Sequence, residues 1–134
     1  MDLLTDDLRQ ALLANGDHRD GLERDPVPVV KFFNPCGAAT WLATELDADG
    51  DTLFGLADLG FGCPELGSFS LAEIAAVRLR FGLRVERDQY FSTAHRLSEW
   101  AAAARQAGSI IGAASHLRRA AMARTNGLSD PSGD

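Results

Sequence analysis

The sequence predicts an α+β fold, in which a small, mainly antiparallel sheet is packed against two or three helices. Residues 27–70 contain five of the seven Phe and both Cys, arranged as β-branched and aromatic runs separated by Gly and Pro. Two of these runs flank Asp49-Gly50, a dipeptide that favours hairpin turns. Runs with helical apolar spacing lie on either side of the region. Together these observations favour hairpin-linked strands with helices packed on them.

The first predicted helix covers residues 6–14. Thr5 can cap its first turn, and acidic residues at positions 6 and 7 suit the positive end of a helix. Asn15-Gly16 suits its end. The polar residues that follow, up to position 26, predict a loop or linker.

Three strands are predicted over 28–33, 40–46 and 52–59, with 66–69 and 83–88 as further candidates. The second and third strands should form an antiparallel hairpin around the D-A-D-G-D turn. Strict alternation along the second strand would place three residues on each face of the sheet. These sets are Trp41, Ala43 and Glu45 on one face, and Leu42, Thr44 and Leu46 on the other.

Two more helices are predicted after the strands. Ser70 and Glu73 form a capping box that should begin a helix over 71–80, with Gly82 as its stop. An alanine-rich helix is expected over 97–107, ending at Gly108. The alanines of 109–124 favour helix without deciding it, and residues 126–134 are expected to fray.

The predicted organisation has three parts: an N-terminal helix and linker (1–26), a single α+β domain (27–108) and a C-terminal extension (109–134). The chain carries 13 Lys and Arg against 19 Asp and Glu, a net charge of −6 that disfavours direct nucleic-acid binding. No apolar run is long enough to span a membrane, and a secretory signal is not evident. We therefore expect a cytoplasmic protein with an unidentified protein partner and no membrane contact.

Sequence motifs for metal or cofactor chemistry are weak, and we predict no catalytic residue, metal site or cofactor. The aspartates at 47, 49, 51 and 58 resemble calcium-loop spacing but lack Gly and Glu at the required places, which favours a solvated hairpin tip. The glycines at 60, 62 and 67 favour turns over a phosphate cradle. The histidines (18, 95 and 116) and the cysteines (36 and 63) have no metal-ligand spacing, and the thiols are expected to be small buried groups.

Acidic residues within apolar strands give the most specific candidate site. Glu45 and Asp58 interrupt strand sequence, where an ionised group is costly unless it is paired, and Lys31 is similarly placed. One interpretation is structural: an ion pair between Lys31 and either carboxylate, with an aspartate that caps a turn. The other is a ligand-binding pocket beside Trp41 that also includes Glu65.

Basic and aromatic residues cluster between positions 78 and 91. The members are Arg78, Arg80, Arg84, Arg87, Tyr90 and Phe91. Such a cluster could contact a phosphate backbone, but acidic residues at 86 and 88 interrupt it, which favours a solvated face.

Three stretches resemble a known family. They are V-V-K-F-F-x-P-x-G-A-A-T-W-L-x-T-E-L-D, then L-F-G-L-x-D-L-G-x-G-x-P-E-L-G, then the S-L-A-E helix start followed by G-L-x-V-E-R-D. Over about residues 27–108 the chain is similar to a small bacterial family of unknown function, common on plasmids and mobile elements and sometimes found near antirestriction genes. The resemblance implies a small accessory protein and supplies no catalytic residue.

The leading functional hypothesis is therefore a non-enzymatic binding or accessory module linked to mobile-element or defence biology. A second hypothesis is an enzyme or small-ligand binder that uses Glu45, Asp58 and Glu65 around Trp41. A third is an acidic mimic of nucleic acid, which requires an exposed stripe of carboxylates.

Overall fold

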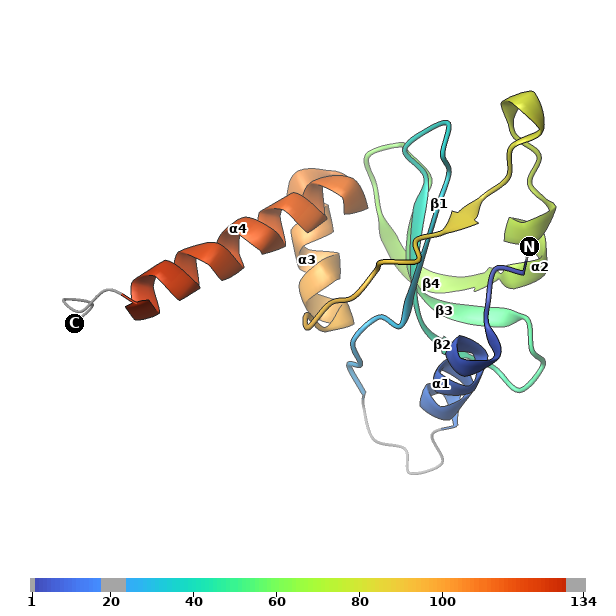
Figure 1. The fold of residues 1–134 in the computed structure, drawn as a ribbon, viewed down its shortest axis with the longest axis horizontal. Helices are drawn as coiled ribbons and strands as arrows, with labels where there is room; N and C mark the ends of the chain where they lie inside the picture. The colour runs from blue at the N-terminus through green and yellow to red at the C-terminus, as the bar shows by residue number, and fades with distance from the viewer. Residues whose placement is uncertain (1, 18–23, 130–134) are drawn as a thin grey trace.

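The computed structural model of the chain describes residues 2–17 and 24–129 (Figure 1). Its elements follow the order helix, four strands, helix, short strand and two helices. They are α1 (Asp6–Gly16), β1 (Val30–Phe33), β2 (Thr40–Leu46), β3 (Thr52–Asp58), β4 (Glu65–Ser70), α2 (Leu71–Ala76), a 3-10 turn (Arg80–Gly82), β5 (Glu86–Arg87), α3 (Leu97–Ala107) and α4 (Ile110–Ser129).

The five strands form one antiparallel sheet in the order β4-β3-β2-β1-β5, which confirms the predicted α+β class. The β2–β3 hairpin turns at Asp49-Gly50, where Gly50 has a φ of 75° that glycine adopts readily. Asp49 accepts hydrogen bonds from the amides of Asp51 (2.8 Å) and Thr52 (2.9 Å). The aspartates at this tip therefore shape the turn, as the solvated-tip interpretation predicted.

A β-bulge at Thr44 overturns the predicted alternation along β2. Ala43 pairs with Gly55 and Glu45 pairs with Phe54, so Thr44 is an extra residue in the strand. The carbonyl of Thr44 accepts a hydrogen bond from the Asn15 side chain of α1 (2.9 Å). Beyond the bulge the two faces are exchanged. Leu46 joins the face of Trp41 and Ala43, while Glu45 lies on the opposite face.

Each face of the sheet is covered by its own layer of helix (Figure 1). Leu4 and Leu12, from the α1 region, pack with sheet residues such as Phe32, Trp41 and Leu46. On the other face, α3 and α4 cover β2 and β3. Their contacts include Leu42, Leu56, Trp100, Ala104 and Ile110. The N-terminal helix is therefore part of the core.

The helix predicted over 71–80 is shorter than expected, because α2 covers only Leu71–Ala76. The Ser70 hydroxyl caps the Glu73 amide as expected (3.1 Å), but α2 ends at Ala76 because Val77 has an extended backbone. The Leu79 amide donates to the Leu83 carbonyl (2.9 Å), so a tight loop replaces the rest of the expected helix. The candidate strand over 83–88 is correspondingly reduced to β5.

The other boundaries differ from prediction by smaller amounts. β3 ends one residue early, β4 extends the candidate strand at both ends, and α1 continues to Gly16. The ambiguous 109–124 segment is helical, and α4 continues to Ser129, so residues 126–129 are helical where fraying was predicted. Residues 18–23 and 130–134, including His18, lie outside the described part. Within the described residues, no helix is sufficiently long and apolar for a membrane span.

Candidate functional site

Asp58, one of the predicted site residues, is fully buried at the end of β3. One carboxylate oxygen accepts from the Gly60 amide (2.8 Å) and the other from the Ile110 amide (2.9 Å). The side chain therefore closes the turn after β3 and caps the first turn of α4. This geometry is the turn-capping arrangement of the structural interpretation.

The structure does not gather the five predicted residues around one pocket. The bulge puts Trp41 and Glu45 on opposite faces of the sheet. Glu65 is exposed and lines a small depression of about 190 Å³ beside Leu59 and Phe61. A ligand-binding role for Trp41, Glu45, Asp58 and Glu65 stays a prediction.

Lys31 does not form the predicted ion pair with Glu45 or Asp58. Its ammonium group lies 3.8 Å from the Asp88 carboxylate, and both side chains are about three-quarters buried. The two residues meet because β5 pairs with β1 and the Asp88 amide continues that pairing to the Lys31 carbonyl (2.9 Å). Lys31 therefore belongs to the β5 edge of the sheet.

The cysteines also differ from expectation, because Cys36 and Cys63 are both exposed free thiols. Each lies in a turn-rich loop between strands, where no core covers it. Across the described ranges, no group of three or more His, Cys, Asp or Glu residues is placed to hold a metal ion.

Two adjoining depressions at the β5 edge form the candidate binding site. One, of about 430 Å³, is lined by β1, β5 and the residues after β5; the other, of about 380 Å³, extends to α3 and α4. Both are lined by Lys31, Asp88 and Tyr90. We call the two depressions together the β5 groove. Their sizes fall in the lower part of the range of ligand pockets.

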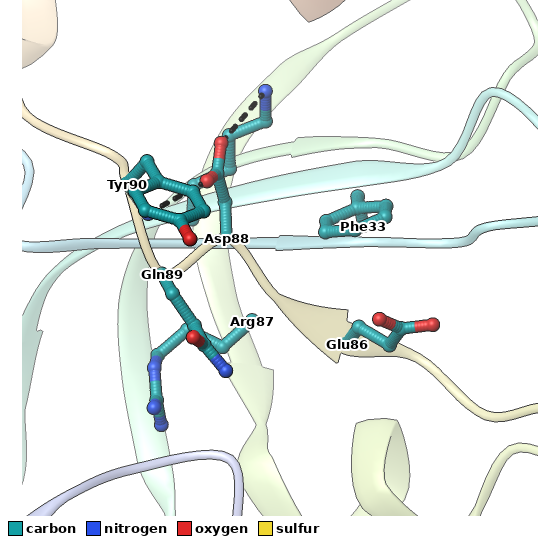
Figure 2. Close-up of a pocket in the computed structure, with 7 residues that line it drawn as sticks. Phe33, Glu86, Arg87, Asp88, Gln89 and Tyr90 are labelled. Carbon is teal, nitrogen blue, oxygen red and sulfur yellow. Dashed lines mark hydrogen bonds and ion pairs between the residues drawn. The ribbon is translucent and has the colours of Figure 1, made fainter.

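Asp88 fixes the backbone that presents Tyr90 to the groove. Its carboxylate accepts from the Tyr90 amide (2.9 Å), which forms an Asx-type turn directly after β5. Tyr90 is 93% exposed, so its ring has almost no contact within the chain. Figure 2 shows the ring beside Asp88, with Glu86 and Phe33 further along the paired strands. An amphipathic ring on a fixed turn is suited to contacting a binding partner.

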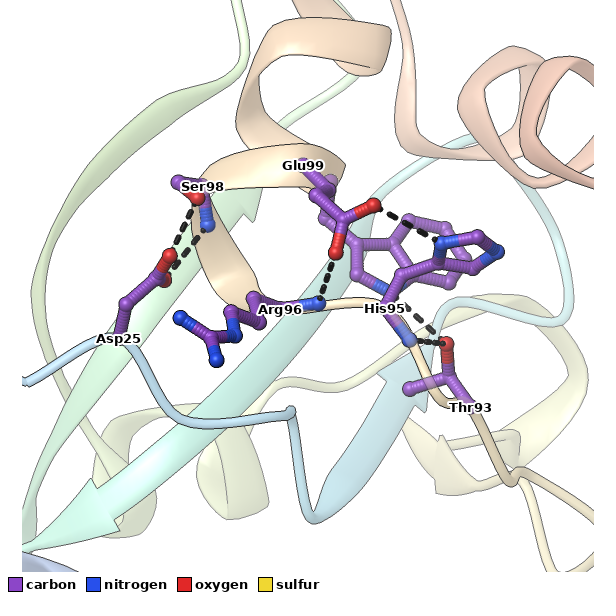
Figure 3. Close-up of polar contacts among 7 residues, drawn as sticks. Asp25, Thr93, His95, Arg96, Ser98 and Glu99 are labelled. Carbon is purple, nitrogen blue, oxygen red and sulfur yellow. Dashed lines mark hydrogen bonds and ion pairs between the residues drawn. The ribbon is translucent and has the colours of Figure 1, made fainter. Parts of the chain in front are cut away.

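Polar contacts at the start of α3 support the second depression (Figure 3). The Thr93 hydroxyl accepts from the Trp100 indole (3.1 Å) and from the His95 amide (3.1 Å). His95 Nδ1 lies 3.2 Å from the Glu99 carboxylate, whose other oxygen accepts from the Arg96 amide (2.9 Å). These bonds hold the residues 93–96 against α3 and fix the wall of the groove.

Comparison with family models gives a match over residues 3–111, to a family described as "Protein of unknown function (DUF2958)". The match covers most of the chain. The chain belongs to the DUF2958 family. Neither the curated proteins nor the solved structures yielded a match.

In this DUF2958 chain the first depression lies wholly within the matched residues. The second is completed by Ala114, Leu117 and Arg118 of α4, which lie beyond the match. The sequence analysis identified Lys31 and placed Tyr90 in a basic and aromatic cluster, but it did not predict that Asp88 and Tyr90 form a turn beside Lys31. The signal that could have found them is the Asp-x-Tyr spacing after a strand, which is typical of an Asx turn.

A carboxylate latch joins the segment before β1 to α3 (Figure 3). Asp25 accepts from the Ser98 hydroxyl and from the Ser98 amide (2.9 Å), and these bonds hold the pKa of Asp25 below its ordinary value. Because the folded-state pKa is lowered, the latch stabilises the fold above about pH 4 and is lost as pH falls through the folded-state pKa.

We therefore expect Ser98→Ala to raise the pKa of Asp25 toward its ordinary value, since both the hydroxyl donor and part of the latch geometry are lost. An NMR titration of the Asp25 carboxyl carbon in the two proteins measures this shift. Asp49, whose pKa is lowered mainly by the Thr52 hydroxyl, is the internal control. An Asp25 titration that is identical in both proteins would exclude the latch.

Proposed function

We propose that this chain is a small cytoplasmic binding protein that holds a segment of a partner protein in the β5 groove. The observation that carries the proposal is Tyr90, which is 93% exposed yet fixed at its backbone between two depressions. Folding leaves this ring unburied, so its apolar area stays available for an intermolecular contact.

The charges of the groove support a polypeptide ligand over a polyanion. Lys31, Arg87 and Arg118 supply positive charge, while Glu86 and Asp88 supply negative charge in the same surface. A polypeptide can place opposite charges against both sets, whereas a nucleic acid would meet the carboxylates unfavourably. The net charge of −6 acts in the same direction.

The biological setting that we propose is accessory function in mobile-element or defence biology, which is supported by the family resemblance. The acidic-pocket enzyme has less support, because both oxygens of Asp58 are engaged by backbone amides. The nucleic-acid mimic also has less support. The Asp49 carboxylate accepts a hydrogen bond within the hairpin turn, and the Asp51 carboxylate accepts one from the Ala72 amide (2.7 Å) at the start of α2.

A photocrosslinking amino acid in place of Tyr90 tests the proposal in the native host. We expect a discrete protein adduct from position 90 that excess unlabelled chain competes away. The matched control places the same group at Met122, which is 60% exposed on α4 and outside the groove. Identical adducts from both positions, or a position-90 probe that reacts only with water, would reject the groove as a partner site.

A further inference from the structure

The loop between α2 and β5 carries an aromatic residue at its tip, and we call residues 77–84 the Phe81 tip. The Leu83 amide donates to the Arg80 carbonyl (3.1 Å), which closes a four-residue turn. Phe81 has φ 60° and ψ 26°, and Gly82 has φ 73°, so both central residues are left-handed. This is the backbone of a type I′ turn, in which Asn, Asp or Gly is preferred at both central positions. In Figure 1 the loop projects from the body of the domain beside α2.

Phe81 is therefore poorly suited to its position as far as folding is concerned. Within the described ranges it is the only non-glycine residue with a positive φ, a conformation that is strained for a bulky side chain. The ring is 93% exposed, so burial does not offset the strain. A residue that costs stability without gaining contacts within its own chain indicates a contact with another molecule.

The surroundings of Phe81 define the chemistry of that molecule. Val77 and Leu83 are also exposed, at 37% and 40%, so the tip presents three apolar side chains. The segment 77–84 contains three arginines and no acidic residue, although the whole chain has a net charge of −6. Arg78 and Arg80 are exposed, while Arg84 also donates to the Ala75 carbonyl of α2 (3.3 Å).

We propose that the Phe81 tip inserts into an apolar pocket with an acidic rim on a partner protein. The pocket would bury the three apolar side chains, and the rim would pair with the arginines. A nucleic acid would stack on the ring and bind the arginines, but its backbone would leave Val77 and Leu83 uncovered and would be repelled by the rest of the chain. The tip does not depend on the β5 groove.

Selection from a displayed library of random peptides, with the full chain as bait, tests this proposal. We expect enrichment of peptides that combine apolar residues with Asp or Glu. Phe81→Asn should lower the affinity of the chain for the selected peptides about tenfold or more, and Arg80→Glu should lower that affinity as well. Phe61→Asn is the matched control, because Phe61 is 82% exposed on a different loop and should leave affinity unchanged. Tyr90→Asn should also leave it unchanged, which separates this site from the groove.

A second readout excludes a merely structural role for Phe81. Because Asn tolerates the left-handed conformation, Phe81→Asn should raise the thermal midpoint by about 3 °C while weakening peptide binding about tenfold or more. Selection of peptides without acidic residues, or binding that survives Phe81→Asn, would overturn the proposal. Binding of an oligothymidine probe that is lost in Phe81→Asn would replace the protein partner with a single-stranded nucleic acid.

Discussion

Gly55→Ala is expected to destabilise the protein by about 3 kcal/mol or more, a large part of the total stability of a small domain. A Cβ atom at Gly55 would overlap the carbonyl oxygen of Leu42 on the neighbouring strand. Gly55 and Leu42 both lie in the paired backbone of β3 and β2, so neither can move away without breaking that pairing next to the Thr44 bulge. Urea unfolding followed by circular dichroism measures the loss.

Gly67→Ala is the matched control for that substitution. Gly67 is the register partner of Gly55 on β4, but a Cβ atom there would meet nothing within 4 Å. Since alanine is favoured over glycine within a strand, this variant should be as stable as the wild type or slightly more stable. Equal losses in the two variants would contradict the close approach of β2 and β3 at Gly55.

Asp58→Ala is expected to cost about 2 kcal/mol, because it leaves the buried Ile110 amide without an acceptor and removes the bond to the Gly60 amide. The change removes the acceptor of the Ile110 amide at the start of α4 and the acceptor that closes the turn after β3, while the Ser109 hydroxyl still caps the Gly112 amide (2.9 Å). The Ile110 amide should therefore exchange with solvent much faster, which hydrogen exchange followed by NMR detects, alongside a lower free energy of unfolding.

Two further variants show whether the loss comes from capping. Asp58→Asn keeps one acceptor oxygen and should fall between the wild type and Asp58→Ala. Glu65→Ala removes an exposed carboxylate and should change stability by less than about 0.5 kcal/mol. If Asp58→Ala proves fully stable, the cap is not present and a role for Asp58 in a ligand site regains support.

The hairpin at Asp49-Gly50 could be predicted because its signals are local: a turn dipeptide between two strand-like runs. The bulge at Thr44 could not, because it depends on Gly55 opposite, on another strand, although an isolated glycine in a strand is a general sign of irregularity. The helix predicted over 71–80 was too long because helical spacing persists through Val77, while the loop closed by Leu79 and Leu83 depends on contacts across the turn.

The candidate site was predictable only in part, for a similar reason. Lys31 stood out as a cation within apolar strand sequence, but its partner depends on the pairing of β5 with β1, which no local pattern specifies. Asp58 stood out because an ionised carboxylate within apolar strand sequence is costly to bury. Its hydrogen-bond donors are the amide of Gly60, nearby in the sequence, and the amide of the distant Ile110. Spacing along the chain indicated which residues were unusual, whereas the sheet order decided what they contact.

Hydrogen exchange of the chain, alone and in complex with the partner captured from position 90, tests the binding role most directly. The β5 groove predicts slower exchange in residues 86–95 of the complex, with unchanged exchange in β3 and β4, which lie toward the opposite edge of the sheet. Protection confined to residues 45–58, with 86–95 exchanging as in the free chain, would contradict a partner site at the β5 groove.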